Sequence, residues 1–374
     1  MWAVAACCVA GTAVVACGTD DASHSGPTTT ATAGRTFFGA DGYPNWAATE
    51  SWLVGFSGSD TDRPDVVPRY AARPIAGGPA TELHPPEGHG RFEPTAVIGN
   101  RDTAVVLGIL CGPGSADGGC PPGPMTGFLL DPLAQTWAPL ELPEGAAATP
   151  TFGVDGVQPT EDGWLVVARN LDGTTNSLFH VSDDAVRLVS TSIPTGRGIC
   201  VMGAHAYVLS AAPQGSDAMG EGTLRLTRTA LNAPSAPTEP VELPPVSAAV
   251  GGIAVQMACD DARVYVTSAQ PVPGNPMPAV HAYDGEAWSP QADLVPSGAT
   301  IAVDTLSSPD GAAIVWSTTS GDDGFVALTN PNGPHRIVEA PGGEGQWQDH
   351  TGTIVFTPSD FGRGSQPLPS IDAS

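Results

Sequence analysis

The sequence predicts an all-β fold built from a repeated four-stranded unit, which is clearest in residues 253–296. Apolar residues alternate with polar ones on both sides of Asp260-Asp261, which indicates a hairpin of two half-buried strands. A second hairpin follows, with Asp284-Gly285 at its turn. Four short strands in about 44 residues are typical of one blade of a β-propeller.

The apolar second strand of this unit recurs along the chain, each time after a turn signal. We count seven copies, at 49–56, 101–109, 161–169, 204–210, 260–268, 309–317 and 350–357. An outer hairpin is expected after each of the first six. The sequence therefore predicts a β-propeller of seven blades, and the uneven spacing leaves six or eight as alternatives. Too few residues follow the last copy for two more strands, so the first and last segments are expected to share one blade.

The composition suits short strands and many turns, and its charge excludes several classes of function. Of the 374 residues, 46 are Gly and 38 are Pro, as expected for an all-β chain. The formal net charge is -25, and all 14 basic residues are Arg. Nucleic acids and anionic lipid surfaces are therefore not expected as partners, because both are bound through Lys and Arg. Without lysine, P-loop, Schiff-base and Ser-x-x-Lys chemistry are excluded.

Residues 1–17 form an uncharged apolar run that is short for a membrane span. The run ends in Val14-Val15-Ala16-Cys17, which resembles the bacterial lipobox. Val14 stands where Leu is usual, and Arg35 is the first basic residue, so the basic start of a leader is missing. The resemblance implies a signal peptide at 1–17, a lipidated Cys17 and a location on the extracytoplasmic side of the cell membrane. An uncleaved N-terminal anchor is the alternative.

The remaining boundaries follow from composition. Residues 18–34 contain no large apolar side chain, which predicts a disordered tether. The β-propeller is expected over 35–360, and 361–374 are expected to form a flexible C-terminal tail.

Two outer hairpins resemble the outer half of a kelch repeat. One contains Asp131-Pro132 and Trp137, and the other contains Tyr283-Asp284-Gly285 and Trp288. The Gly-Gly pair of kelch repeats is not in register, so the chain resembles β-propellers in general, kelch-like or WD40-like. The resemblance implies a fold but not a ligand, because propeller functions vary widely.

Four cysteines lie outside the leader, and they allow three pairings. Cys111 and Cys120 flank a Gly-rich loop, whereas Cys200 and Cys259 lie in the inner hairpins of consecutive repeats. We predict the disulfides Cys111–Cys120 and Cys200–Cys259, in agreement with an exported protein. Four buried thiols are the alternative. Zinc is disfavoured because the spacing of zinc ligands is absent.

Motifs that suggest catalysis each lack a required part. Gly55–Ser59 resembles a serine-hydrolase elbow without its final Gly and without a following helix. Ser308–Trp316 resembles the Asp-box of sialidases, with its Gly one residue early. The Asp-box forms a turn and is not a catalytic site. We therefore predict no catalytic residues.

Loops with carboxylates or histidines could in principle bind a metal. Asp60, Asp62 and Asp65 could hold calcium, but their loop lacks the glycine of an EF-hand. His84 and His89 share a Pro/Gly loop without a third ligand. We predict no metal site and no cofactor.

Five aromatic residues stand at similar points of the repeats: Trp52, Trp164, Tyr207, Tyr265 and Trp316. They either pack between blades or form a ring around the central channel that stacks on a sugar or peptide. Alternation alone cannot separate these two arrangements, because the register is unknown.

The sequence thus predicts a lipid-anchored extracytoplasmic β-propeller, monomeric, that binds or scaffolds a protein or an envelope carbohydrate through the loops of one rim. The alternative is a propeller enzyme that hydrolyses glycans or esters at one channel mouth. A structural role in an envelope complex differs from the first function only in its partner.

Overall fold

Six β-sheets make up the described part of the chain in the computed structural model. The structure describes residues 46–57, 69–88, 91–111, 125–142, 151–160, 162–170, 174–182, 185–196, 198–212, 223–232, 237–244, 255–270, 277–318, 323–341, 344–348, 352–357 and 367–372. These residues belong to a unit over 35–374, and residues 1–34 form a separate unit. The signal peptide, Cys17 and the tether at 18–34 lie outside the described residues.

Five of the sheets each contain four antiparallel strands that are consecutive in the chain. The first two are β5 (Phe92–Asn100), β6 (Thr103–Leu110), β7 (Met125–Asp131) and β8 (Thr136–Leu140), then β9 (Thr151–Thr160), β10 (Gly163–Asn170), β11 (Thr175–Val181) and β12 (Val186–Pro194). The next two are β13 (Gly198–Met202), β14 (His205–Ala212), β15 (Thr223–Ala230) and β16 (Glu239–Val241), then β17 (Met257–Cys259), β18 (Val264–Gln270), β19 (Met277–Tyr283) and β20 (Trp288–Pro290). The fifth is β21 (Ala299–Leu306), β22 (Ala313–Thr318), β23 (Asp323–Leu328) and β24 (Arg336–Pro341), preceded by a short 3₁₀ helix, η2 (Ala292–Leu294).

The sixth sheet combines the two ends of the described chain, in the order β27-β26-β25-β1-β2-β3-β4. Its strands are β1 (Trp46–Ala48), β2 (Trp52–Ser57), β3 (Arg69–Pro74), β4 (Thr81–Leu83), β25 (Glu344–Gln348), β26 (Thr353–Thr357) and β27 (Ser370–Asp372). The two parts are joined by a parallel pairing between Ala48 and Gln348.

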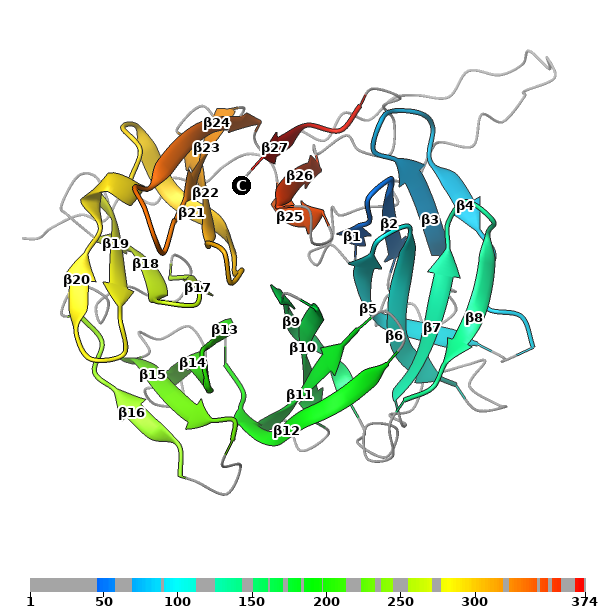
Figure 1. Ribbon diagram of the computed structural model, residues 1–374, viewed down its shortest axis with the longest axis horizontal. Coiled ribbons are helices and arrows are strands. Elements are labelled where there is room, and N and C mark those ends of the chain that lie inside the picture. Colours follow the sequence, from blue (N-terminus) through cyan, green and yellow to red (C-terminus); the bar gives the residue numbers. More distant parts are fainter. Residues whose placement is uncertain are drawn as a thin grey trace, which may run out of the picture. The chain divides into compact units, whose positions relative to one another are not determined.

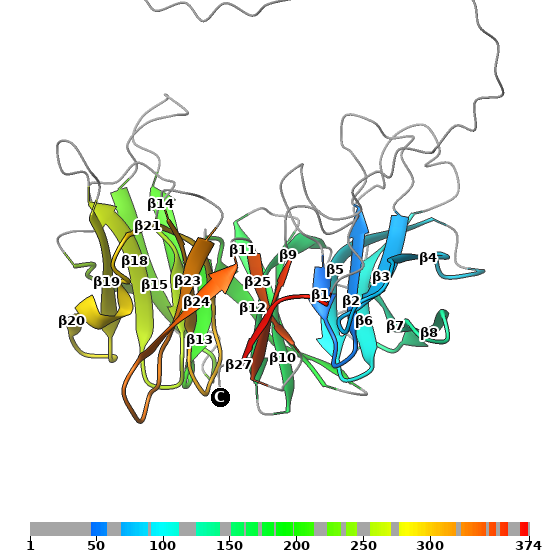
Figure 2. The same ribbon diagram turned by 90° about the horizontal axis from the view of Figure 1, so that it is seen from above.

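The sheets stand around a common axis, with the first strand of each repeat innermost (Figure 1). The innermost strands contact one another in the order β1, β5, β9, β13, β17, β21 and β25, and β25 contacts β1. Figure 2 shows the strands running between two rims. Among the described residues, no helix is long and apolar enough to cross a membrane.

The predicted β-propeller is present, but the predicted number of seven blades is wrong. The predicted second strand of each of the seven repeats is present, as β2, β6, β10, β14, β18, β22 and β26. The described strands nevertheless make six sheets, because the pairing of β25 with β1 merges the last hairpin with the first sheet. The expectation that the first and last segments share a sheet is thereby confirmed.

The expected flexible tail over 361–374 contains a strand. Its residues Ser370–Asp372 form β27, which pairs with β26. Ile371 is buried between exposed neighbours, and Leu368 is buried just before the strand. Burial of these two apolar side chains favours docking of this segment on the sheet.

The cores lie between neighbouring sheets, which explains the pattern of burial along the repeats. In β22, four consecutive residues, Ala313–Trp316, are buried, because both faces of a middle strand are covered. The outer strand β8 is mostly exposed, with only Leu140 buried. One core cluster contains Tyr265 of β18 and Trp316 of β22, so it spans two neighbouring sheets.

A buried carboxylate connects the same two sheets. Asp260 is fully buried, and its Oδ1 accepts the backbone N–H groups of Ala262 and Arg263 at 2.9 and 2.8 Å. Its Oδ2 accepts the hydroxyl of Tyr265 at 2.8 Å and that of Thr329, beyond β23, at 3.0 Å. Burial, followed by the charge of Asp260, raises the pKa of the Tyr265 phenol. The carboxylate thus has four donors.

Candidate functional site: a groove between two sheets

The structure confirms one of the two predicted disulfides. Cys200 of β13 and Cys259 of β17 are joined, with their Cα atoms 5.8 Å apart. The bridge links the innermost strands of two neighbouring sheets, as their positions in consecutive repeats predict. Cys111 is buried and also disulfide-bonded. Its predicted partner, Cys120, lies outside the described residues, so the pairing Cys111–Cys120 stays a prediction.

The motifs weighed for catalysis fall on turns and strand ends. Ser57 ends β2, and the rest of the elbow-like motif, 58–59, is outside the described part. In the Asp-box-like motif, Ser308 donates its backbone N–H to Cys259 and accepts one from Gly311. Trp316 of the same motif is buried, so the motif acts as a turn between packed sheets.

The loops considered for metal binding lie only partly within the described residues. Asp60, Asp62, Asp65 and His89 lie outside the described residues. His84 is exposed and its carbonyl oxygen accepts a hydrogen bond from Trp137. Within the described ranges, no group of three or more His, Cys, Asp or Glu could hold a metal ion.

Four of the five repeated aromatic residues are buried in the cores between sheets. Trp164, Tyr207, Tyr265 and Trp316 are at most 5% exposed, and each belongs to a core cluster. Trp52 is half-buried and packs on a further cluster. The packing interpretation is therefore confirmed for the four buried residues.

A hydroxyl, an imidazole and a carboxylate meet at the β9–β10 turn. His180 Nε2 lies 3.0 Å from Asp162 Oδ1 and 3.3 Å from Thr160 Oγ1. In a catalytic triad the carboxylate binds the ring nitrogen that faces away from the nucleophile. Here both groups share one nitrogen, so the arrangement does not have the geometry of a triad. The charge of His180 lowers the pKa of Asp162.

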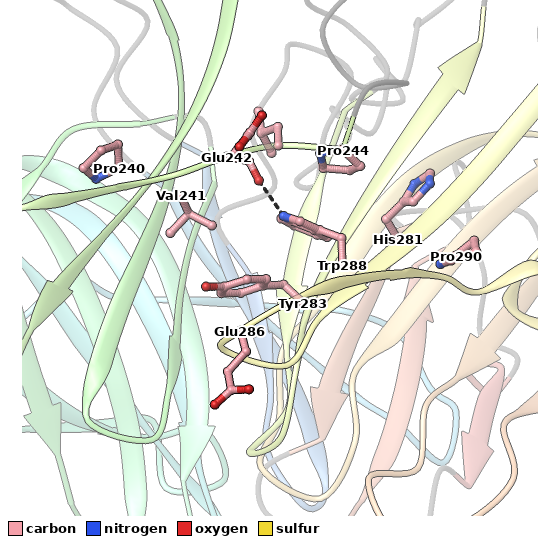
Figure 3. A pocket seen from close by; sticks show the side chains of 10 residues that line it. Pro240, Val241, Glu242, Pro244, His281, Tyr283, Glu286, Trp288 and Pro290 are labelled. Carbon is pink, nitrogen blue, oxygen red and sulfur yellow. Dashed lines mark hydrogen bonds between the residues drawn. The ribbon is translucent and has the colours of Figure 1, made fainter.

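A groove of about 550 Å³ lies between the sheets β13–β16 and β17–β20. One wall is formed by residues 240–244, from β16 and the segment after it. The other wall comes from β19, β20 and the turn between them, with His281, Tyr283, Glu286, Trp288 and Pro290 (Figure 3). The groove therefore opens along the outer strands of two neighbouring sheets.

Two aromatic rings form the centre of the groove. Tyr283 and Trp288 are cross-strand partners on β19 and β20, which places both side chains on one face. Their ring centroids are 5.1 Å apart with an interplanar angle of 36°. Tyr207, from the opposite sheet, contacts Tyr283 edge-on at 6.3 Å. The indole of Trp288 is half-buried.

Both rings are held by hydrogen bonds to the backbone. The indole Nε1–H of Trp288 donates to the carbonyl oxygen of Glu242 on the opposite wall at 2.6 Å (Figure 3). The phenol of Tyr283 donates to the carbonyl oxygen of Gly285 at 2.7 Å. The orientation of the two rings is thus set before a ligand arrives.

The turn that carries Glu286 is held by its first residue. Asp284 Oδ1 accepts the backbone N–H groups of Glu286 and Ala287, both at 2.9 Å. Gly285 has a φ of +101°, a left-handed conformation that favours glycine. The hydrogen bonds from Ala287 and Glu286 lower the pKa of Asp284.

The charged side chains of the groove are acidic. Glu242 and Glu286 are both exposed, and Figure 3 shows their carboxylates on opposite sides of the Tyr283–Trp288 pair. His281 is the basic residue of the lining; its Nδ1 is buried and has no hydrogen-bond partner in the structure as described. Burial lowers the pKa of His281, which favours the neutral form of the imidazole.

The sequence alone does not predict this groove, although it singles out the two aromatic residues at its centre. Tyr283 and Trp288 belong to the kelch-like pattern. Neither Glu242 nor His281 is predicted as a site residue from the sequence, because they lie on different sheets and share no motif. One signal could have located Glu242. It directly follows the outer strand β16, just as His84, which accepts the indole N–H of Trp137, directly follows the outer strand β4.

Comparisons with known proteins concern the fold alone. The chain matches no family model, and no curated protein is significantly similar to it. Solved structures similar to it include the β-propeller domain of the Trilobed protease from Pyrococcus furiosus, at 8% identity, covering 83% of this chain and 89% of that one, with a TM-score of 0.46. An oligogalacturonate lyase in complex with manganese is 14% identical over 87% of this chain and 84% of that one, with a TM-score of 0.45. YCF48 bound to a D1 peptide is 10% identical over 91% and 98%, with a TM-score of 0.45.

Proposed function

We propose that the chain is an extracytoplasmic binding module, anchored through Cys17, whose ligand site is the groove between the sheets β13–β16 and β17–β20. Its ligand is a protein or an envelope carbohydrate at the cell surface. The observation that carries the proposal is the half-buried indole of Trp288, which packs on the ring of Tyr283 at a 36° tilt and donates a hydrogen bond to the carbonyl oxygen of Glu242 across the groove.

The groove has the features of a recognition site. Ligand sites are concave and mostly apolar, with a few polar groups that orient the ligand. Here Val241 and Leu243 supply apolar lining, and the two exposed carboxylates supply the polar groups. A pre-oriented aromatic ring gives a large contact area at little entropic cost.

The disulfide supports the location. Structural disulfides persist in oxidising compartments outside the cytoplasm. The Cys200–Cys259 bridge joins the two sheets that form the groove. A lipid on Cys17 would keep such a module at the membrane surface.

The binding function can be tested by site-specific photo-cross-linking in intact cells. A photoreactive phenylalanine analogue is placed at position 290 on the groove wall, or at position 133, where Leu133 is 76% exposed on another sheet. We expect a defined adduct from position 290 that is absent from position 133 and is lost in Trp288→Ala. The same adducts from both positions, or none from position 290, would overturn the proposal.

The anchor is tested separately with Cys17→Ala. We expect the protein to leave the membrane fraction and to lose the mass of the acyl chains. Cys8→Ala, in the same leader, is the control and should leave both unchanged. Unchanged fractionation of Cys17→Ala would contradict lipidation at this residue.

A further inference from the structure

Most of the potential hydrogen-bond donors in the lining of the groove are already paired or are absent. The indole N–H of Trp288 and the phenol of Tyr283 already donate to backbone carbonyls. Pro240, Pro244 and Pro290 line the groove and have no backbone N–H. Apart from the imidazole of His281, whose Nδ1 has no hydrogen-bond partner among the described residues, the side-chain polar groups left for a ligand are the two carboxylates, which are acceptors.

The charges in and around the groove also favour a ligand that donates hydrogen bonds. Glu242 and Glu286 are exposed acceptors at the groove. Two cations lie nearby: Arg228 pairs with Glu239 on the neighbouring strand at 2.8 Å, and the charge of Arg263 acts on Asp284 of the turn. The whole chain carries a formal net charge of -25, so its field attracts cations toward the groove and repels anions from it.

We propose that the occupant of the groove is a basic segment of a protein partner, bound through Arg or Lys side chains. This inference rests on the proposed function of the groove. Arg and Lys side chains bring only donors and a positive charge, which complements a site with spare acceptors and two carboxylates. A guanidinium also pairs with a carboxylate through two hydrogen bonds and stacks on an indole. A sugar hydroxyl would use the acceptors but not the charge.

The test uses full-length protein in nonionic detergent and short fluorescent peptides. In one peptide Arg alternates with Gly. In its matched control each Arg is citrulline, which has the same shape but no charge. Binding is measured by fluorescence anisotropy at low and high ionic strength. We expect the Arg peptide to bind about tenfold more tightly than the citrulline peptide at low salt, and the difference to shrink at high salt.

Two double variants locate the interaction. Glu242→Gln with Glu286→Gln removes the carboxylates of the groove, and we expect about fivefold weaker binding of the Arg peptide. Glu87→Gln with Glu141→Gln makes the same change of charge at exposed positions in the segments after β4 and β8 and should change binding less than about twofold. All four side chains are exposed, so thermal unfolding should be unchanged, and this is checked first.

Two outcomes overturn the inference. Equal losses in both double variants would mean general attraction to an acidic protein. Equal binding of the Arg and citrulline peptides would mean that charge is not recognised. If the photo-adduct at position 290 then persists in the Glu242→Gln, Glu286→Gln variant, only the basic ligand is wrong. An absent adduct in the parent protein would remove the proposed function itself.

Discussion

Trp137 and Trp288 hold equivalent positions in two different sheets. Each indole N–H donates to the carbonyl oxygen of the residue that directly follows the outer strand of the preceding sheet, His84 at 2.7 Å and Glu242 at 2.6 Å. Each ring also contacts a tyrosine, Tyr70 in one case and Tyr283 in the other. Beside Trp288 the same bridge between sheets also forms part of a groove.

Because the two indoles make equivalent contacts, comparing their variants distinguishes an effect on stability from an effect on binding. Trp288→Phe and Trp137→Phe both remove one hydrogen bond and keep an aromatic ring, so each should lower the free energy of unfolding by about 1 kcal/mol. Only Trp288→Phe should weaken the adduct at position 290. Urea unfolding and the photo-cross-link measure the two effects. Equal loss of the adduct in both variants would assign it to a general loosening of the sheets.

Asp260 is expected to be the most sensitive carboxylate described here. Asp260→Ala leaves two backbone N–H groups and two hydroxyls without their acceptor in a buried place, which should cost about 3 kcal/mol. Asp284→Ala also removes an acceptor of two N–H groups, but at an exposed turn where water replaces it, so about 1 kcal/mol or less is expected. Comparable losses in urea unfolding would contradict this ranking.

The close approach of β1 and β5 should make Gly99 intolerant of a side chain. A Cβ at Gly99 would lie 1.9 Å from the carbonyl oxygen of Ala48, so Gly99→Ala must push two innermost strands apart. We expect a loss of about 3 kcal/mol. Gly198→Ala is the control, because its Cβ would meet Met257 at an ordinary 3.4 Å and should cost less than about 1 kcal/mol. Thermal unfolding of both variants decides the point.

The lowered pKa of His281 predicts a dependence of stability on pH. The unfolded imidazole titrates near the ordinary value of about 6.5, whereas burial lowers the pKa in the folded state. The unfolded state therefore binds more protons as the pH falls below about 6.5, and stability is lost in that direction. His281→Gln should reduce this loss, and His84→Gln, at an exposed position, should not. An unchanged pH profile of His281→Gln would contradict the assignment.

The second disulfide can be checked by peptide mapping under non-reducing conditions. We expect one linked pair with Cys200 and Cys259, and another with Cys111 and Cys120. Any exchange between the two pairs would contradict the sequence-based pairing. Replacing Cys200 and Cys259 by Ala should cost roughly 2 to 5 kcal/mol, measured by thermal unfolding against the parent protein.

The sequence by itself determined the local features of this protein. The alternation of apolar and polar residues is a local property of a strand. For this reason the second strand of each repeat is located correctly from the sequence. The turns before Trp137 and Trp288 can also be predicted from the sequence, because in each one an Asp side chain accepts a backbone N–H of its own hairpin. The bond between Cys200 and Cys259 followed from their matching places in consecutive repeats.

Only the tertiary structure decided how the sheets meet. The number of sheets depends on the pairing of Ala48 with Gln348, residues at opposite ends of the fold. The burial of Trp316 depends on the sheet that faces it, which alternation cannot give without register. Glu242 and Trp288 come together only because two outer strands lie side by side. Contacts between sheets join residues far apart in the chain, and no local pattern carries that information.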